Sequence, residues 1–452
     1  MSKNKPFGIV FNLSLILFFI GLIGFLSYIS FKLYQKTFYK KIIAIFTGIL
    51  TILLMVIVVV GIIDIRMLIP SVSSKTLTEE EWIADIRFLD RTLKAHPGYN
   101  DSLGDIVSNF RYEMEKSKTF DAYEANKTAM QMVSAFKDGH SYVMPFQFYF
   151  KTRYLPIQVC EFVDGVYITD SKYGELVGGK IVSINNQKIE DLLKNIKSLI
   201  GADNSNYAKY QSALYIPSLD VLKMIDNTVL KTEANIKVIL KGKEQTRKIK
   251  SVSALRWLFW SFTPTSDWRP VGHGVRNKNT VEKKSDTLIY FTFNKTGPEE
   301  NLNAISNKIK HDVNSGKIKH LLIDMRNNTG GDNTTYNYLI KVLTEAKVNL
   351  TLFTSRKTFS AGLNFISELK LKRKFIIIGE ASGAGHNHYG DAQMLLLPNS
   401  GLMFSMSTRE WLFIPEIKEN TIVPDREIKY KSYDYFNHFD PWMDKFSSER
   451  FL

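Results

Sequence analysis

The chain has 452 residues, enough for two to four domains, and its 44% hydrophobic and 23% charged residues exclude a disordered or collagen-like protein. The formal net charge is +14, but residues 1–74 hold seven basic side chains against one acidic one, and the remaining surplus forms no dense basic block. This distribution argues against a nucleic-acid-binding protein. The single cysteine, Cys160, excludes an internal disulfide and a cysteine-based zinc site.

Two long uncharged apolar runs open the chain, at residues 8–31 and 42–63. Each exceeds the roughly 20 residues that a transmembrane helix needs, so residues 1–70 are predicted to form a two-helix membrane anchor. The loop between the runs contains four lysines, and the positive-inside rule places such a loop in the cytoplasm. The sequence therefore predicts a cell-membrane protein with two spans whose remaining residues form an extracytoplasmic domain.

A helical N-terminal subdomain is predicted at 76–148. Apolar residues recur at helical spacing over 78–95, where Thr78 and Glu81 match a capping box, and again over 120–136. The pattern then changes to short strands with glycine turns, including an apparent hairpin around Gly242. We expect a β-rich module at 150–262.

From Leu288 the pattern alternates between strands and helices, which is typical of α/β architecture with a largely parallel sheet. We therefore predict a catalytic core at 285–430 and a C-terminal tail at 431–452. The expected strands lie at 288–291, 320–324, 348–354 and 375–379, and the expected helices at 299–313, 334–345 and 361–371.

In open α/β sheets reactive groups gather beyond the carboxyl ends of the strands. The strand at 320–324 leads to a polar turn that ends in Gly330 and Gly331, which suits either an oxyanion hole or an ordinary glycine turn. The next strand leads to Ser360, directly before a helix whose first amide belongs to Ala361. Such a serine is either a helix N-cap or a nucleophile beside an oxyanion-stabilising amide.

Five motifs, in order across residues 78–430, resemble the serine peptidase family of the tail-specific (C-terminal processing) proteases, the tricorn core protease and the interphotoreceptor retinoid-binding protein modules. They are Lys-Asp-Gly-His-Ser at 137–141, the stretch 179–185, the turn 324–331, Thr-Phe-Ser-Ala at 358–361, and the loop 379–390 with 397–401. The resemblance implies an α/β fold with a crotonase-like (ClpP-like) catalytic core, a PDZ-like module in the β-rich region and an N-terminal helical segment.

The resemblance also implies that Ser360 is the nucleophile and that the amides of Ala361 and of Gly330 or Gly331 form the oxyanion hole. Tail-specific proteases use a lysine about two dozen residues after the serine, but no lysine occurs here between Lys374 and Lys418. The chain is therefore closer to the tricorn-like, retinoid-binding-protein-like branch.

That branch uses a histidine after the N-terminal helices, and His140 stands at that place. A neutral imidazole can take the proton of a serine at neutral pH. His386 is the alternative base. The resemblance implies a glutamate shortly before a Pro-Asp pair as the third group, which indicates Glu419, and Ser141 is a possible accessory partner of His140.

The sequence thus predicts a membrane-anchored extracytoplasmic serine peptidase that cleaves a peptide or protein substrate through an acyl-enzyme. It implies no metal, no organic cofactor and no nucleic-acid partner, and it leaves the oligomeric state open. His386, His388 and Asp391 make only a weak case for a metal site, because no third histidine lies nearby in the sequence. The alternative function is a catalytically inactive relative that binds a peptide or a hydrophobic ligand.

Overall fold

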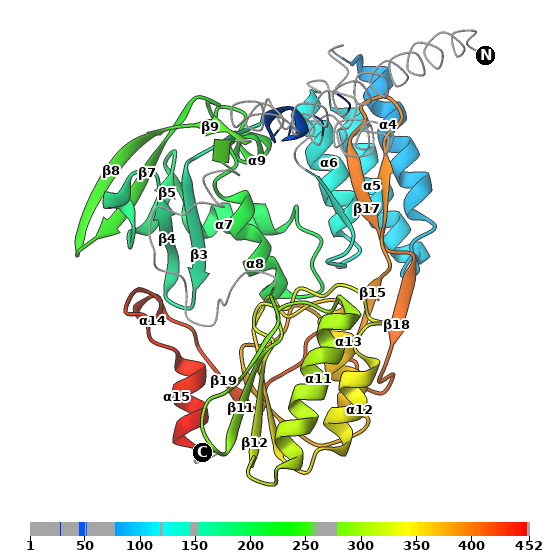
Figure 1. The fold of residues 1–452 in the computed structure, drawn as a ribbon. Coiled ribbons are helices and arrows are strands. Elements are labelled where there is room, and N and C mark those ends of the chain that lie inside the picture. Colours follow the sequence, from blue (N-terminus) through cyan, green and yellow to red (C-terminus); the bar gives the residue numbers. More distant parts are fainter. Residues whose placement is uncertain are drawn as a thin grey trace. The chain divides into compact units, whose positions relative to one another are not determined.

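The computed structural model describes residues 28, 45–49, 51, 77–117, 121–144, 152–254, 256–257 and 278–449. The chain divides into two units, residues 1–73 and residues 74–452. Figure 1 shows the elements of the larger unit. The predicted spans at 8–31 and 42–63 lie almost entirely outside the described residues. Within the described ranges, no helix combines the length and the hydropathy needed to cross a bilayer.

Three helices open the larger unit: α4 (Glu79–Leu93), α5 (Asp101–Lys116) and α6 (Ala122–Ser134). The predicted helices at 78–95 and 120–136 are present as α4 and α6, and the capping box of Thr78 and Glu81 is formed. After α6 the chain turns into β1 (Tyr142–Val143), which pairs with β17 (Met403–Met406) and so joins a small sheet with β16 (Gln393–Leu396). This pairing fixes the 137–141 motif against the C-terminal part of the chain.

The β-rich region contains a sheet in the order β3-β4-β5-β7-β8, with β6 paired to β5. Its strands are β3 (Ile157–Phe162), β4 (Gly165–Ser171), β5 (Lys180–Ile184), β6 (Gln187–Lys188), β7 (Glu233–Leu240) and β8 (Lys243–Lys250). The hairpin predicted around Gly242 joins β7 to β8, and both turn residues, Lys241 and Gly242, have positive φ. A separate pair is formed by β2 (Arg153–Tyr154) and β9 (Val252–Ser253).

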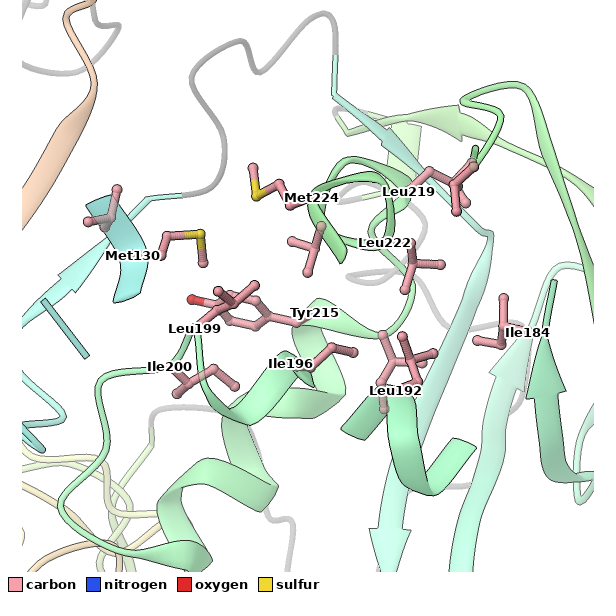
Figure 2. Packing of buried hydrophobic residues seen from close by; sticks show 14 of the residues in the cluster. Met130, Ile184, Leu192, Ile196, Leu199, Ile200, Tyr215, Leu219, Leu222 and Met224 are labelled. Atoms are coloured by element: carbon pink, nitrogen blue, oxygen red, sulfur yellow. The ribbon is translucent and has the colours of Figure 1, made fainter. Parts of the chain in front are cut away.

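Three helices that the sequence pattern did not reveal lie within this region: α7 (Ile189–Lys197), α8 (Ser205–Tyr215) and α9 (Leu219–Ile225). A short 3-10 turn, η1 (Gly174–Leu176), precedes β5. Figure 2 shows how Leu192 and Ile196 of α7, Tyr215 of α8 and Leu222 of α9 gather in one buried apolar cluster. This cluster makes α8 a fixed element beside the site described below.

The α/β core is a six-stranded sheet in the order β10-β11-β12-β13-β14-β19, parallel except for the β10–β11 pair. The strands are β10 (Thr280–Lys283), β11 (Leu288–Thr292), β12 (His320–Asp324), β13 (Asn349–Thr354), β14 (Ile376–Gly379) and β19 (Arg426–Glu427). The helices α11 (Glu299–Asn314), α12 (Asn337–Glu345) and α13 (Ala361–Lys370) cover one face (Figure 1). The predicted alternation of strands and helices is therefore present.

The predicted C-terminal tail contains two helices, α14 (Ser432–Phe436) and α15 (Pro441–Ser448). Trp442 and Phe446 of α15 pack on the other face of the core sheet, and the Trp442 Nε1 donates a hydrogen bond to the Thr354 carbonyl over 3.0 Å. The glycine-rich loop after β14 leads into β15 (Asn387–Gly390), which pairs with β18 (Arg409–Leu412).

Candidate active site

Ser360 stands between β13 and α13, at the N-cap position, but its side chain makes no capping hydrogen bond. Its backbone has a φ of 54°, a conformation that costs a non-glycine residue about 1–3 kcal/mol. The structure thus holds the serine in a strained strand-to-helix turn and leaves its hydroxyl uncommitted to the helix. The Oγ instead lies 2.9 Å from the Nε2 of His140, which is 220 residues earlier in the chain.

The loop before Ser360 is tied to the turn that follows β12. The Ser355 Oγ donates to the Arg326 carbonyl over 2.6 Å, and the Thr358 Oγ1 donates to the Met325 carbonyl over 3.0 Å. The Phe359 amide donates to the Asn328 carbonyl over 3.0 Å. These bonds hold the serine and the glycine turn in one fixed arrangement.

Gly330 and Gly331 both have positive φ, and each lies where a side chain would clash. A Cβ on Gly330 would lie 2.6 Å from the Cβ of Ser360, so only glycine allows the turn to approach the serine this closely. The Gly330 amide already donates to the Asn328 Oδ1 over 3.0 Å. No described residue accepts a hydrogen bond from the Gly331 amide, and the first amide of α13, from Ala361, has no partner within the helix. The amides of Gly331 and Ala361 are thus the pair available for an oxyanion.

The His140 imidazole is held between two other rings. It stacks on Phe359 with centroids 4.5 Å apart and faces His388 in a nearly parallel arrangement at 6.0 Å. Its backbone carbonyl accepts a hydrogen bond from the Ser405 Oγ over 2.7 Å. Burial and the nearby His140 lower the pKa of His388 to about 4, so His388 is a neutral neighbour.

Asp138 is the carboxylate beside His140. Its Oδ1 accepts a hydrogen bond from the His140 amide over 2.9 Å and lies 3.7 Å from the His140 Nδ1, close enough for an ion pair but too long for a hydrogen bond. Its Oδ2 accepts from the Ser141 Oγ over 2.5 Å and is bonded to the His96 Nε2 over 3.1 Å. Burial opposes ionisation, but the side chains of His140, His96 and Ser141 outweigh it and hold the Asp138 pKa below its usual range. Asp138 is therefore a buried anion next to the imidazole.

The tautomer of His96 follows from its two partners. The Nδ1 accepts a hydrogen bond from the Gly98 amide over 3.0 Å, so in the neutral ring the proton is on Nε2, which donates to Asp138. Neither His96 nor Asp138 was identified as a site residue from the sequence. Asp138 lies inside the 137–141 motif, which was a usable signal, whereas nothing in the sequence relates His96 to a residue 42 positions later.

The other predicted site residues lie elsewhere. Ser141 bonds Asp138, as described above. His386 is buried, and its Nδ1 is hydrogen-bonded to the Ser367 Oγ over 2.8 Å, while burial lowers its pKa to about 4. Glu419 is exposed, and no hydrogen bond or ion pair joins it to His140 in the part of the chain that the structure describes. Asp138 thus occupies the place beside the imidazole that the resemblance assigned to Glu419.

A cavity of about 450 Å³ opens over the serine and the imidazole. Its wall includes Ser360, His140, Gly331, Ala361 and Trp411. Within the described residues, no three His, Cys, Asp or Glu side chains are grouped in a way that suits a metal ion. The cavity therefore presents a hydroxyl, an imidazole and two amides to whatever enters it.

Comparison with solved structures shows that this fold is shared with CPAF. Mature CPAF complexed with lactacystin has 11% sequence identity and a TM-score of 0.58, covering 82% of this chain and 97% of that one. The photosystem II D1 C-terminal processing protease has 12% sequence identity and a TM-score of 0.40, covering 78% of this chain and 94% of that one. The tricorn protease has 15% sequence identity and a TM-score of 0.40, covering 82% of this chain and 36% of that one. No family model and no curated protein sequence matches the chain. The resemblance inferred from the five motifs is confirmed at the level of the fold.

Proposed function

We propose that the chain is a serine-type peptidase that hydrolyses peptide bonds through an acyl-enzyme, with Ser360 as nucleophile and His140 as base. One observation carries the proposal: a strained, uncapped serine at the start of a helix has its Oγ 2.9 Å from an imidazole nitrogen inside a cavity. The arrangement of a nucleophile, a base and an adjacent carboxylate is the one that activated-serine hydrolysis requires. The fold shared with CPAF supports the same function.

The chemical steps follow from the geometry. The Ser360 Oγ attacks the substrate carbonyl carbon while the His140 Nε2 takes the hydroxyl proton, and the carbonyl oxygen becomes an oxyanion facing the amides of Gly331 and Ala361. The imidazolium then gives its proton to the departing amine, which leaves the acyl group on Ser360. A water molecule, deprotonated by the same imidazole, hydrolyses this ester and restores the serine.

The Asp138 carboxylate is proposed to stabilise the imidazolium that forms in each step. Its Oδ1 lies 3.7 Å from the His140 Nδ1, so an ion pair forms when the imidazole takes the serine proton. Catalytic hydrogen bonds are often long in the absence of substrate and tighten when it binds. The carboxylate itself keeps its charge throughout, because its lowered pKa opposes protonation.

The test is hydrolysis of internally quenched peptides by the full chain in detergent micelles. We expect cleavage by the wild type and a loss of at least about 10³-fold in kcat/KM for both Ser360→Ala and His140→Ala. A folded wild-type protein that binds the peptides without cleaving them would support the binding-protein alternative instead.

We also propose that residues 1–70 anchor the enzyme in the cell membrane with two spans and hold the catalytic unit outside the cytoplasm. The support is the two uncharged runs of 24 and 22 residues and the lysine-rich loop between them. An alkaline phosphatase reporter fused after residue 76 should be active, since that enzyme folds only outside the cytoplasm. An inactive reporter made in normal amounts would reverse the proposed orientation.

A further inference from the structure

A second cavity, of about 290 Å³, adjoins the one over Ser360. The two cavities share three wall residues, Gly139, Tyr142 and Tyr207. Gly139 directly precedes His140, so the second cavity begins beside the imidazole. The two cavities therefore meet at these three residues.

Among the residues that the structure describes, those of the second cavity's wall include no charged side chain. Besides the shared residues it consists of Met144, Ile200, Gly201, Gln211, Leu214 and Tyr215. Ile200 and Tyr215 belong to the buried cluster in Figure 2, so this part of the wall is held by the core. A charged group placed here would lose hydration and gain no ionic partner, whereas an apolar group would gain contact area.

Tyr207 links the second cavity to the base. Its ring stacks on Phe359 with centroids 4.2 Å apart, and Phe359 in turn stacks on His140 at 4.5 Å. A Cβ on Gly139 would lie 2.7 Å from Tyr207 and 2.8 Å from Phe359, so these rings close tightly over the backbone before the base. The wall that a bound group would touch is thus the same stack that positions the imidazole.

We propose that the second cavity is the side-chain subsite of the enzyme and that it selects an apolar side chain, aliphatic or aromatic, on a substrate residue next to the scissile bond. This proposal rests on the proposed peptidase function. The volume is at the small end for ligand sites, which fits one side chain rather than a longer segment. The uncharged wall favours an apolar side chain. The wall residues shared with the first cavity place that side chain next to the scissile bond.

The experiment compares hexapeptides in which each position in turn is Leu, Phe, Asp or Lys, with the full chain in micelles. After the cleaved bond is mapped by mass spectrometry, one flanking position should favour Leu or Phe over Asp and Lys by about 10–200-fold in kcat/KM. Equal rates for all four residues at both flanking positions would overturn the proposal.

Charge variants at Leu214 test whether this cavity is the one that selects. Leu214 is 43% exposed, so a charged replacement there can fold. Leu214→Lys should raise the kcat/KM for the Asp peptide relative to that for the Lys peptide. Leu214→Glu should have the opposite effect. Leu230→Lys, at an exposed position that lines neither cavity, should leave the preference unchanged. Identical preferences in the two Leu214 variants would contradict the assignment.

Binding separates this inference from the peptidase function. Fluorescence anisotropy with Ser360→Ala protein measures the same peptides without turnover. A preference for apolar residues that Leu214→Lys removes would support the subsite even if the wild type cleaved nothing. Cleavage without any side-chain preference would support the peptidase function and contradict the subsite. If the protein showed no binding and no cleavage, both proposals would be contradicted.

Discussion

His96 and Asp138 meet through the Nε2 of the histidine and the Oδ2 of the aspartate, 3.1 Å apart and both fully buried. Together with the Ser141 Oγ, this histidine binds the Oδ2 of the carboxylate, while the Oδ1 is the oxygen that lies near His140. The His140 imidazole therefore lies next to a buried anion that has its own hydrogen-bond donors.

Removal of the Asp138 charge should impair acylation. We expect Asp138→Asn to lower kcat by about 10²–10⁴-fold, because the imidazolium loses its only neighbouring anion among the described residues. Glu419→Gln is the matched control and should change kcat less than about twofold, since Glu419 is exposed and has no contact with His140. Steady-state kinetics on folded variants decide the point, and the opposite ranking would restore Glu419 as the third group.

The buried carboxyl of Asp203 should make stability depend on pH. Burial, and then the nearby charge of Asp138, raise the Asp203 pKa well above its ordinary value, while its Oδ2 accepts the Gly139 amide over 2.8 Å. With a raised folded pKa, the folded state holds the proton more tightly, so this contribution is fully present below about pH 4 and falls as the pH rises.

Asp203→Asn keeps an acceptor for the Gly139 amide and removes the ionisable group. The variant should therefore exceed the wild type in free energy of unfolding at pH 8, and the difference should shrink toward pH 4. Urea unfolding at pH 4, 6 and 8 measures this. A difference that stays constant with pH would show that Asp203 has the same pKa in the folded and unfolded chain.

A methyl group on Gly330 should remove activity because it would clash with Ser360, and not only because the backbone there has a positive φ. Gly330→Ala would place a Cβ 2.6 Å from the Cβ of Ser360, so either the serine or the glycine turn must move. We expect a loss of at least about 10²-fold in kcat, because a displacement of a reacting group by about 1 Å lowers the rate by that factor.

Gly316→Ala is the control for this prediction. Gly316 also has positive φ, 75°, but a Cβ there would meet nothing within 4 Å. The Gly316→Ala variant should lose about 1 kcal/mol of stability, because alanine is strained at a positive φ, and should keep its activity. Equal losses of activity in the two variants would mean that the close approach to Ser360 is unimportant.

His386 should contribute to acid sensitivity and not to acylation. Its folded pKa of about 4 lies below the unfolded value near 6.5, so the stability it contributes is present above about pH 6.5 and is lost as the pH falls toward 4. His386→Gln should be less sensitive to acid over this interval in thermal melts and should acylate within about twofold of the wild type. A large loss of acylation would instead favour His386 as the base.

The α/β core was predictable because its strands are buried on both faces and appear as continuous apolar runs. The strand at His320–Asp324 was predicted with its observed bounds, and Ser360 was singled out because it lies between a strand and a helix. In contrast, α5 went unnoticed because only Gly104, Val107 and Met114 of its 16 residues are buried, which leaves no clear helical period.

The residues of the candidate site could be proposed from the sequence only where they lie within local motifs. Ser360, His140 and the glycine turn each belong to a recognisable stretch of sequence. The carboxylate nearest the imidazole, Asp138, lies two positions before His140 inside the 137–141 motif, whereas His96 meets Asp138 through tertiary packing that no spacing encodes. The hydrogen bond from the Gly330 amide to the Asn328 Oδ1 also depends on a side-chain orientation that the sequence does not specify.

The central claim is that His140 activates Ser360, and the rate of covalent modification by a fluorophosphonate tests it most directly. The wild-type chain should form an adduct that mass spectrometry maps to Ser360, and His140→Ala should slow its formation by at least about 10²-fold while the protein stays folded. No adduct on folded wild type, or an adduct at Ser360 that forms at the same rate without the imidazole, would contradict the account.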